Sequence, residues 1–133
     1  MDSESPVLAK TVWKHLSQRQ GDGWKKPTDA SDDQAFLMVQ CMEAWFLADH
    51  DALNSFLNTK TFKRANNVES ILKIDVMKHI EAGFKKGKQG DYRKGSDSWK
   101  ILSQLRPSEI RRASKHAEDF FRKLEECCDK FKS

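Results

Sequence analysis

The 133-residue sequence contains no apolar run longer than five residues, so it offers no segment that could cross a bilayer as a helix. Its first ten residues, MDSESPVLAK, are acidic and lack the basic start and apolar core of a signal peptide. Both observations predict a cytoplasmic protein. The length predicts one domain over residues 1–133, because two independent cores would each be too small.

Cysteine and histidine are scarce, and their spacing argues against a disulfide framework and against a zinc site. The three cysteines form no C-x-x-C pair, and their odd number suits reduced thiols. The four histidines lie far apart, without zinc-ligand spacing. Aromatic residues are plentiful, with eight Phe and four Trp, which excludes wholesale disorder. We expect the four Trp and most Phe in the core, because packing is the commoner use of such residues than stacking on bases.

Charge is distributed unevenly along the chain. Residues 1–59 carry five Lys or Arg against nine Asp or Glu, whereas residues 60–133 carry nineteen against eleven. A metal-dependent enzyme that acts on phosphates needs carboxylates for the ion and cations for the polyanion. The asymmetry fits that class of protein, but a basic face that is merely solvated is the commoner cause of such an asymmetry.

One apolar run indicates a strand, and most of the other patterns indicate helices. Residues 35–40 follow a polar loop over residues 21–34 and have the composition of a strand buried on both faces. Helical spacing begins again at Met42, and Asp49 can cap a second helical segment. A strand that leads into a helix predicts an α/β fold, although one strand by itself makes no sheet.

Helical spacing also marks residues 6–20, residues 68–84 and the C-terminal quarter of the chain. Ser96 can cap a helix that bears Trp99, and Pro107 opens the last predicted helix. Between them, residues 85–95 (KKGKQGDYRKG) predict an exposed basic loop that could wrap a phosphate backbone, with a tyrosine available for stacking. The candidate nucleic-acid contacts are Lys85, Lys86, Lys88, Tyr92, Arg93 and Lys94.

Three carboxylates stand out by position. Asp2 and Glu4 lie two residues apart, so in an extended backbone they project to the same side and together can bind a divalent cation. The spacing alone favours an ordinary frayed acidic terminus over a metal site. Glu43 lies in an apolar strand-to-helix junction, where an isolated charge is costly and where ligand sites form in α/β proteins. An outward-facing Glu on the first helical turn would fit the same pattern.

The segment DDQAFLMVQCMEAWFLADHDAL closely resembles an uncharacterised bacterial Toprim-like family, the domain of unknown function 4276. The resemblance extends over essentially the whole chain. Its further motifs are Asp2-Ser3-Glu4-Ser5-Pro6-Val7, Trp13-Lys14-His15-Leu16, Asp22-Gly23-Trp24, Pro27, Val68-Glu69, Lys73-Ile74-Asp75-Val76 and Tyr92-Arg93-Lys94-Gly95.

The resemblance implies an incomplete Toprim-like, Rossmann-like α/β domain with few strands and a mainly helical C-terminal half. Family members are typically longer and carry an N-terminal half whose first strand ends in a glycine-rich motif bearing a glutamate. The chain therefore resembles the C-terminal portion of a Toprim-like domain. Since the missing glutamate serves Toprim domains as acid, base or metal ligand, whether this chain is itself an enzyme stays open. A missing half would also expose a sheet edge, which predicts self-association.

Toprim domains bind Mg²⁺ or Mn²⁺ through clustered carboxylates and act on phosphodiesters. By resemblance, Asp2, Glu4 and Glu43 are the metal ligands, and Glu43, Lys73 and Lys94 are the catalytic residues, with the two lysines contacting phosphate. Solvated lysines at a helix end and in a loop are the alternatives. The implied function is a metal-dependent nuclease-type protein or its remnant, with an ATPase partner in phage defence. A non-catalytic module that binds nucleic acid or protein is the alternative.

Overall fold

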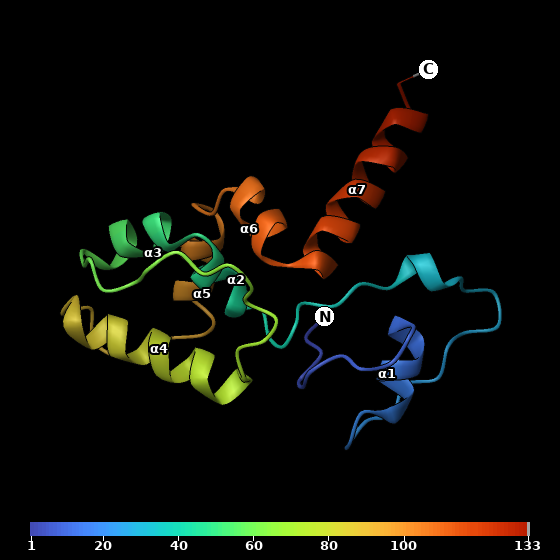
Figure 1. The fold of residues 1–133 in the computed structure, drawn as a ribbon, viewed down its shortest axis with the longest axis horizontal. Helices are drawn as coiled ribbons and strands as arrows, with labels where there is room; N and C mark the ends of the chain where they lie inside the picture. The colour runs from blue at the N-terminus through green and yellow to red at the C-terminus, as the bar shows by residue number, and fades with distance from the viewer. Residues whose placement is uncertain (133) are drawn as a thin grey trace.

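The computed structural model of the chain describes residues 1–132, and the regular secondary structure in this range is helical. Helices α2 to α6 form one body, α1 lies on the opposite side of the N-terminal segment, and α7 projects away from both (Figure 1). The helices are α1 (Val12–Gln18), α2 (Ala44–Ala48), α3 (His50–Leu57), α4 (Lys73–Lys86), α5 (Asp97–Leu102), α6 (Pro107–Ala113) and α7 (Lys115–Lys130), with a short 3₁₀ helix at Asp32–Gln34.

The predicted α/β, Rossmann-like fold is wrong, because none of residues 1–132 belongs to a strand or a sheet. Residues 35–40 are extended, and Leu37 and Val39 are buried, as the apolar run predicts. Their pairing, however, is an isolated parallel bridge between Asp2 and Met38. A sheet needs further extended segments beside this pair, and in the described residues the remaining apolar segments form helices instead.

Helix α2 is the centre of the main core. Four of its five residues are buried, and it packs against α3, α4 and α6. The α2 sequence AWFLA is apolar on all sides, and a helix of this kind is stable only when its neighbours enclose it. A smaller cluster of Leu16, Leu37 and Val39 attaches α1 to the extended segment.

Three helix starts show how far local signals determined the helices. Asp49 caps α3 by accepting a hydrogen bond from the Ala52 N–H (3.2 Å), and Pro107 stands in the first turn of α6; both confirm the sequence prediction. The sequence predicts one helix from Pro107 onwards, but the structure has two, α6 and α7. The chain is extended at Ser114, whose hydroxyl accepts a hydrogen bond from the Ala117 N–H (3.2 Å) and so caps α7. Within residues 1–132, no helix combines the length and apolar composition that a membrane span requires.

Two expectations about the second half of the chain also need correction. Lys85 and Lys86 are not in a loop but in the last turn of α4, which ends as Gly87 passes close to the backbone oxygen of Leu57. Trp99 is not in the core, because 71% of its surface is exposed on α5.

Candidate functional site

The pairing of the two extended segments places Asp2 beside the turn that precedes α2. Backbone hydrogen bonds join Ser3 N to Met38 O (3.1 Å) and Glu4 N to Gln40 O (2.8 Å). Beyond this short pairing, the Asp2 carboxylate accepts a hydrogen bond from the Met42 N–H (2.8 Å). Asp2 therefore lies against the turn that also carries Glu43.

Glu43 is completely buried at the N-terminal end of α2. Its Oε1 accepts a hydrogen bond from the Tyr92 hydroxyl (3.1 Å) and lies 3.7 Å from the Lys94 ammonium, whose side chain is 62% exposed. Its Oε2 is buried and has no hydrogen-bond partner among the described residues. An ionised carboxylate out of contact with water is strongly unfavourable unless its oxygens are satisfied. The loss of hydration at Oε2 of Glu43 is thus not compensated by a hydrogen bond from the described residues.

The electrostatic environment couples Asp2 to Glu43. Burial raises the pKa of Asp2 above its usual value, the hydrogen bond from Met42 opposes that change, and the negative charge of Glu43 raises the pKa further. Lys94 has the opposite effect on the same carboxyl. Two carboxyl groups and one lysine therefore act on each other in this site, and negative charge is in excess.

Cys41, next to this pair, is a buried thiol without nucleophilic character. Burial raises its pKa to about 11, and the charge of Glu43 contributes in the same direction. The reactive form of cysteine is the thiolate, which a raised pKa disfavours at neutral pH. Cys41 is therefore a packing residue in the wall of the site.

Glu4 and Lys73, which the resemblance assigns to metal and phosphate, form an ion pair with each other. The hydrogen bond to Glu4 raises the pKa of Lys73. The backbone at the start of α4 is fixed next to them, because the Lys73 N–H donates to the Gln40 side-chain oxygen (3.2 Å). Glu4 and Lys73 therefore neutralise each other at the edge of the site, and among the described residues neither side chain has a further ion-pair partner.

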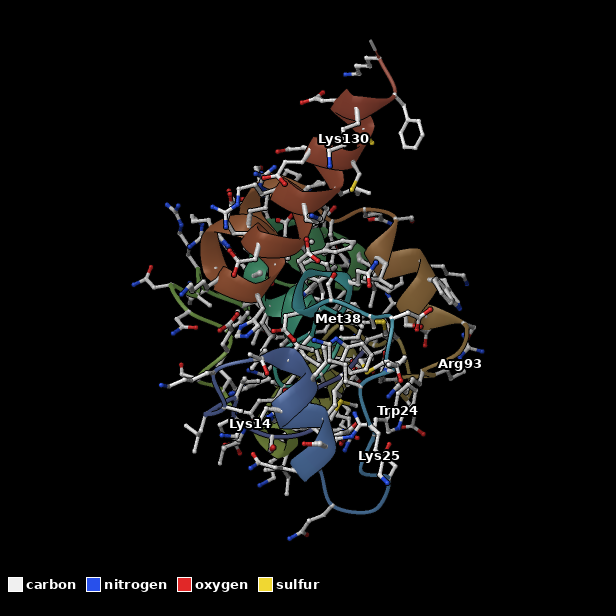
Figure 2. All side chains as sticks on the ribbon, turned by 90° about the vertical axis from the view of Figure 1, so that its right-hand side faces the viewer. Lys14, Trp24, Lys25, Met38, Arg93 and Lys130 are labelled. Atoms are coloured by element: carbon white, nitrogen blue, oxygen red, sulfur yellow. The ribbon has the colours of Figure 1, made fainter. Side chains whose placement is uncertain are left out.

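The cations of the basic segment are divided between the end of α4 and the turn before α5. Lys85 lies about 18 Å from Lys73 along the axis of α4, at the rise of an ideal helix. Lys88 follows beyond the helix end and is exposed, with a left-handed backbone (φ 56°). The Lys94 ammonium lies 3.7 Å from Glu43 Oε1, and Figure 2 shows Arg93 at the edge of the molecule.

Tyr92 has a different role from the predicted stacking on bases. Its ring packs against Phe46 and Phe84, with centroids 6.4 and 5.3 Å away, and its hydroxyl donates to Glu43. Burial, followed by the charge of Glu43, raises its pKa above the ordinary range. This half-buried ring is packed against two phenylalanines, and its hydroxyl positions the Glu43 carboxylate.

Arg19 is a site residue that the sequence did not indicate. Its Nη1 donates to the backbone oxygen of Asp2 (2.8 Å), while its guanidinium also pairs with Asp22. The two partners of the first contact are 17 residues apart and belong to no common motif, so no local signal could have revealed it.

The described residues contain no group of three or more His, Cys, Asp or Glu side chains arranged to hold a metal ion. The predicted trio of Asp2, Glu4 and Glu43 is therefore not formed, because Glu4 pairs with Lys73. Asp2 and Glu43 remain as two neighbouring carboxylates. Mg²⁺ is commonly held by one or two carboxylates, with water and substrate phosphate completing its six ligands. Asp2 and Glu43 are the carboxylates that such an ion would use here, and Oε2 of Glu43, although buried, has no hydrogen-bond partner among the described residues.

Comparison with known proteins identifies one family over the whole of this site. The family model described as a domain of unknown function (DUF4276) matches residues 1–125. No curated protein and no solved structure matches the chain.

Proposed function

We propose that this chain, which belongs to the family described as a domain of unknown function (DUF4276), is a divalent-cation-dependent phosphodiesterase of the nuclease type. The observation that carries the proposal is Glu43: a completely buried carboxylate with one unpartnered oxygen, coupled to a second, half-buried carboxylate at Asp2. Natural proteins keep such unfavourable groups where function uses them.

Each residue of the site has a role in this chemistry. Asp2 and Glu43 would hold Mg²⁺ or Mn²⁺, and a bound cation would activate water and neutralise charge on a phosphate oxygen. Tyr92 fixes Oε1 of Glu43 by its hydrogen bond. Lys94 has its ammonium beside Glu43 and an exposed side chain, so it can contact a phosphate at the same place. The metal chemistry is the one that the Toprim-like resemblance implies; the α/β sheet of Toprim domains is no part of the proposal.

A non-catalytic module that binds nucleic acid is the second candidate. The observation that favours it is the lack, among residues 1–132, of a third ligand beside Asp2 and Glu43. Both candidates bind polyanions through Lys94 and its neighbours. They differ in whether a divalent cation binds and whether the strand is cut.

The test is calorimetric titration of Mg²⁺ and of Mn²⁺ into the full chain, together with cleavage of a labelled oligonucleotide with and without a chelator. We expect the wild type to bind the cation and Glu43→Gln to bind it at least about tenfold more weakly, because a charged ligand is lost. Glu81→Gln removes an exposed carboxylate on α4 and is the matched control. Binding of the oligonucleotide with neither cation binding nor cleavage would support the binding module, and unchanged cation binding by Glu43→Gln would exclude the site.

Thermal unfolding tests whether Glu43→Gln loses cation binding because it fails to fold. Without cation, Glu43→Gln should be at least as stable as the wild type, because it removes a buried charge that repels Asp2. With millimolar Mg²⁺, the melting temperature should rise for the wild type and stay unchanged for Glu43→Gln, because a ligand of the native state stabilises that state.

A further inference from the structure

Trp99 is a large aromatic side chain that the fold leaves in water. It stands on α5 with 71% of its surface exposed, although tryptophan is usually well buried. Single exposed apolar residues are common, so the exposure of Trp99 matters only through its neighbours.

Two cations precede Trp99 in the chain and are held to the start of its helix, where the Arg93 side chain also pairs with Asp97 (3.5 Å). The Arg93 N–H donates to the buried carboxylate of Asp97 (2.8 Å), and the Asp97 N–H donates to the Arg93 backbone oxygen (2.8 Å). The hydroxyl of Ser98 likewise donates to the backbone oxygen of Lys94. These reciprocal hydrogen bonds fix the backbone of Arg93 and Lys94 to the first turn of α5, which carries Trp99.

This unit is open to solvent on the side of the cations. The Arg93 side chain is 71% exposed and the Lys94 side chain 62% exposed, while Lys100 next to Trp99 is exposed as well. A Cβ added at Gly95 would meet no described atom within 4 Å, so the space there is free. Lys94 connects this exposed unit to the carboxylate site, because its ammonium lies 3.7 Å from Oε1 of the buried Glu43.

We propose that Trp99 is a stacking platform for an unpaired base of single-stranded nucleic acid, whose backbone follows Arg93 and Lys94 to the Asp2–Glu43 site. The proposal rests on the proposed function for the position of that site and adds the substrate class, a single strand. An indole can stack only on a base whose face is free, and in a duplex the bases are already stacked. Cations beside an exposed aromatic residue are the usual combination in proteins that bind single strands.

The experiment measures binding of the full chain to a fluorescent single strand of about 12 nucleotides and to the duplex of the same length, across a salt series. A chelator is present throughout, so no cleavage occurs. Trp99→Ala should weaken single-strand binding roughly 5- to 100-fold, the usual effect of losing one base stack. Trp99→Phe should recover most of the affinity, and duplex binding should change little.

The salt dependence separates stacking from charge. Trp99→Ala removes no cation, so it should leave the slope of log affinity against log salt unchanged, whereas Lys94→Gln should reduce that slope by about 0.7. Phe131→Ala, which removes an aromatic side chain 89% exposed after the end of α7, is the control and should have no effect.

Equal single-strand affinity of Trp99→Ala and Phe131→Ala would overturn the inference, and so would duplex binding as tight as single-strand binding in the wild type. Cation titration distinguishes this failure from failure of the proposed function. Unchanged Mg²⁺ binding with no effect of Trp99→Ala would leave the phosphodiesterase proposal standing. A loss of single-strand binding in Trp99→Ala, in a chain that binds no Mg²⁺, would support the strand site and exclude the metal-dependent activity.

Discussion

The carboxylate of Asp49 is held by Arg106, which donates to it from its backbone N–H (2.8 Å), from Nε (3.0 Å) and from Nη2 (2.7 Å). Asp49 is completely buried, and burial by itself would raise its pKa. The hydrogen bonds from Arg106 and Ala52 outweigh burial, so the pKa of Asp49 is lowered and the residue stays charged. One pair thus ties the start of α3 to the start of α6.

Arg106→Ala should lower the free energy of unfolding by about 1–3 kcal/mol, because it leaves a buried carboxylate with two backbone donors and no counter-charge. Urea unfolding followed by circular dichroism measures the change. Arg122→Ala breaks the exposed pair with Asp119 and serves as the control, with an expected change below about 1 kcal/mol. Similar changes for the two variants would show that the buried pair contributes no more than a surface pair.

Glu69 and His116 make the stability of the α7 start dependent on pH. Glu69 Oε1 accepts from the Ser114 hydroxyl (2.7 Å) and from the His116 backbone N–H (2.8 Å), and it pairs with His116 Nδ1 (3.0 Å). Burial opposes ionisation of Glu69, but the bonds from His116 and Ser114 prevail and lower its pKa to about 2. The bond to Glu69 raises the pKa of His116 above 6.5.

The directions of the two pKa shifts define the pH range in which this contact stabilises the fold. The contribution of Glu69 is present above its unfolded pKa of 4.5 and is lost as pH falls through about 2. The contribution of His116 is full below 6.5 and is lost as pH rises through its raised folded value. Glu69→Gln should therefore lose most stability between pH 4.5 and 6.5, and its difference from the wild type should shrink on both sides. Urea midpoints of both proteins, within this pH range and on both sides of it, measure the difference in stability. A constant difference at all pH values would contradict the dependence of this contact on the charges of Glu69 and His116.

Gly87 permits the close approach of α4 to the end of α3. A Cβ at this position would collide with the backbone oxygen of Leu57, which cannot move as a side-chain end can. Gly87→Ala should therefore cost about 1–3 kcal/mol of stability, measured by urea unfolding. Gly95→Ala is the matched control, because an added Cβ there meets no described atom within 4 Å. Equal stability of the two variants would mean that α4 can shift at no cost.

The basic residues after α4 should contribute to nucleic-acid binding through charge. Replacing Lys88, Arg93 and Lys94 together by Ala should flatten the salt dependence by about 0.7 to 0.9 units for each phosphate contact removed, and so by at most about three units in total. The same three-charge loss at Lys10, Lys14 and Lys25, all exposed, is the control. Identical slopes for the two triple variants would show that these cations only raise the overall net charge.

Local pattern in the sequence determined most of the helices. The spacing of apolar residues marked α3, α4 and α7, and single residues marked the starts of α3 and α6. These signals act between neighbours a few residues apart, so they need no knowledge of the rest of the fold. The same locality explains the errors. A five-residue apolar run, AFLMV, fits a strand and an isolated extended segment equally well, and Ser114 interrupts an apolar spacing that continues across it.

Only the tertiary structure decided the environment of the charged residues. The sequence singled out Asp2, Glu4 and Glu43, but the fold paired Glu4 with Lys73, buried Glu43 and turned Tyr92 towards it. These contacts join residues 49 and 69 positions apart. Long-range pairs produce no periodic pattern in a sequence, because each residue of the pair is compatible with its own helix or turn whether or not its partner is present. Whether a carboxylate is neutralised, buried or exposed is therefore determined by how the helices pack.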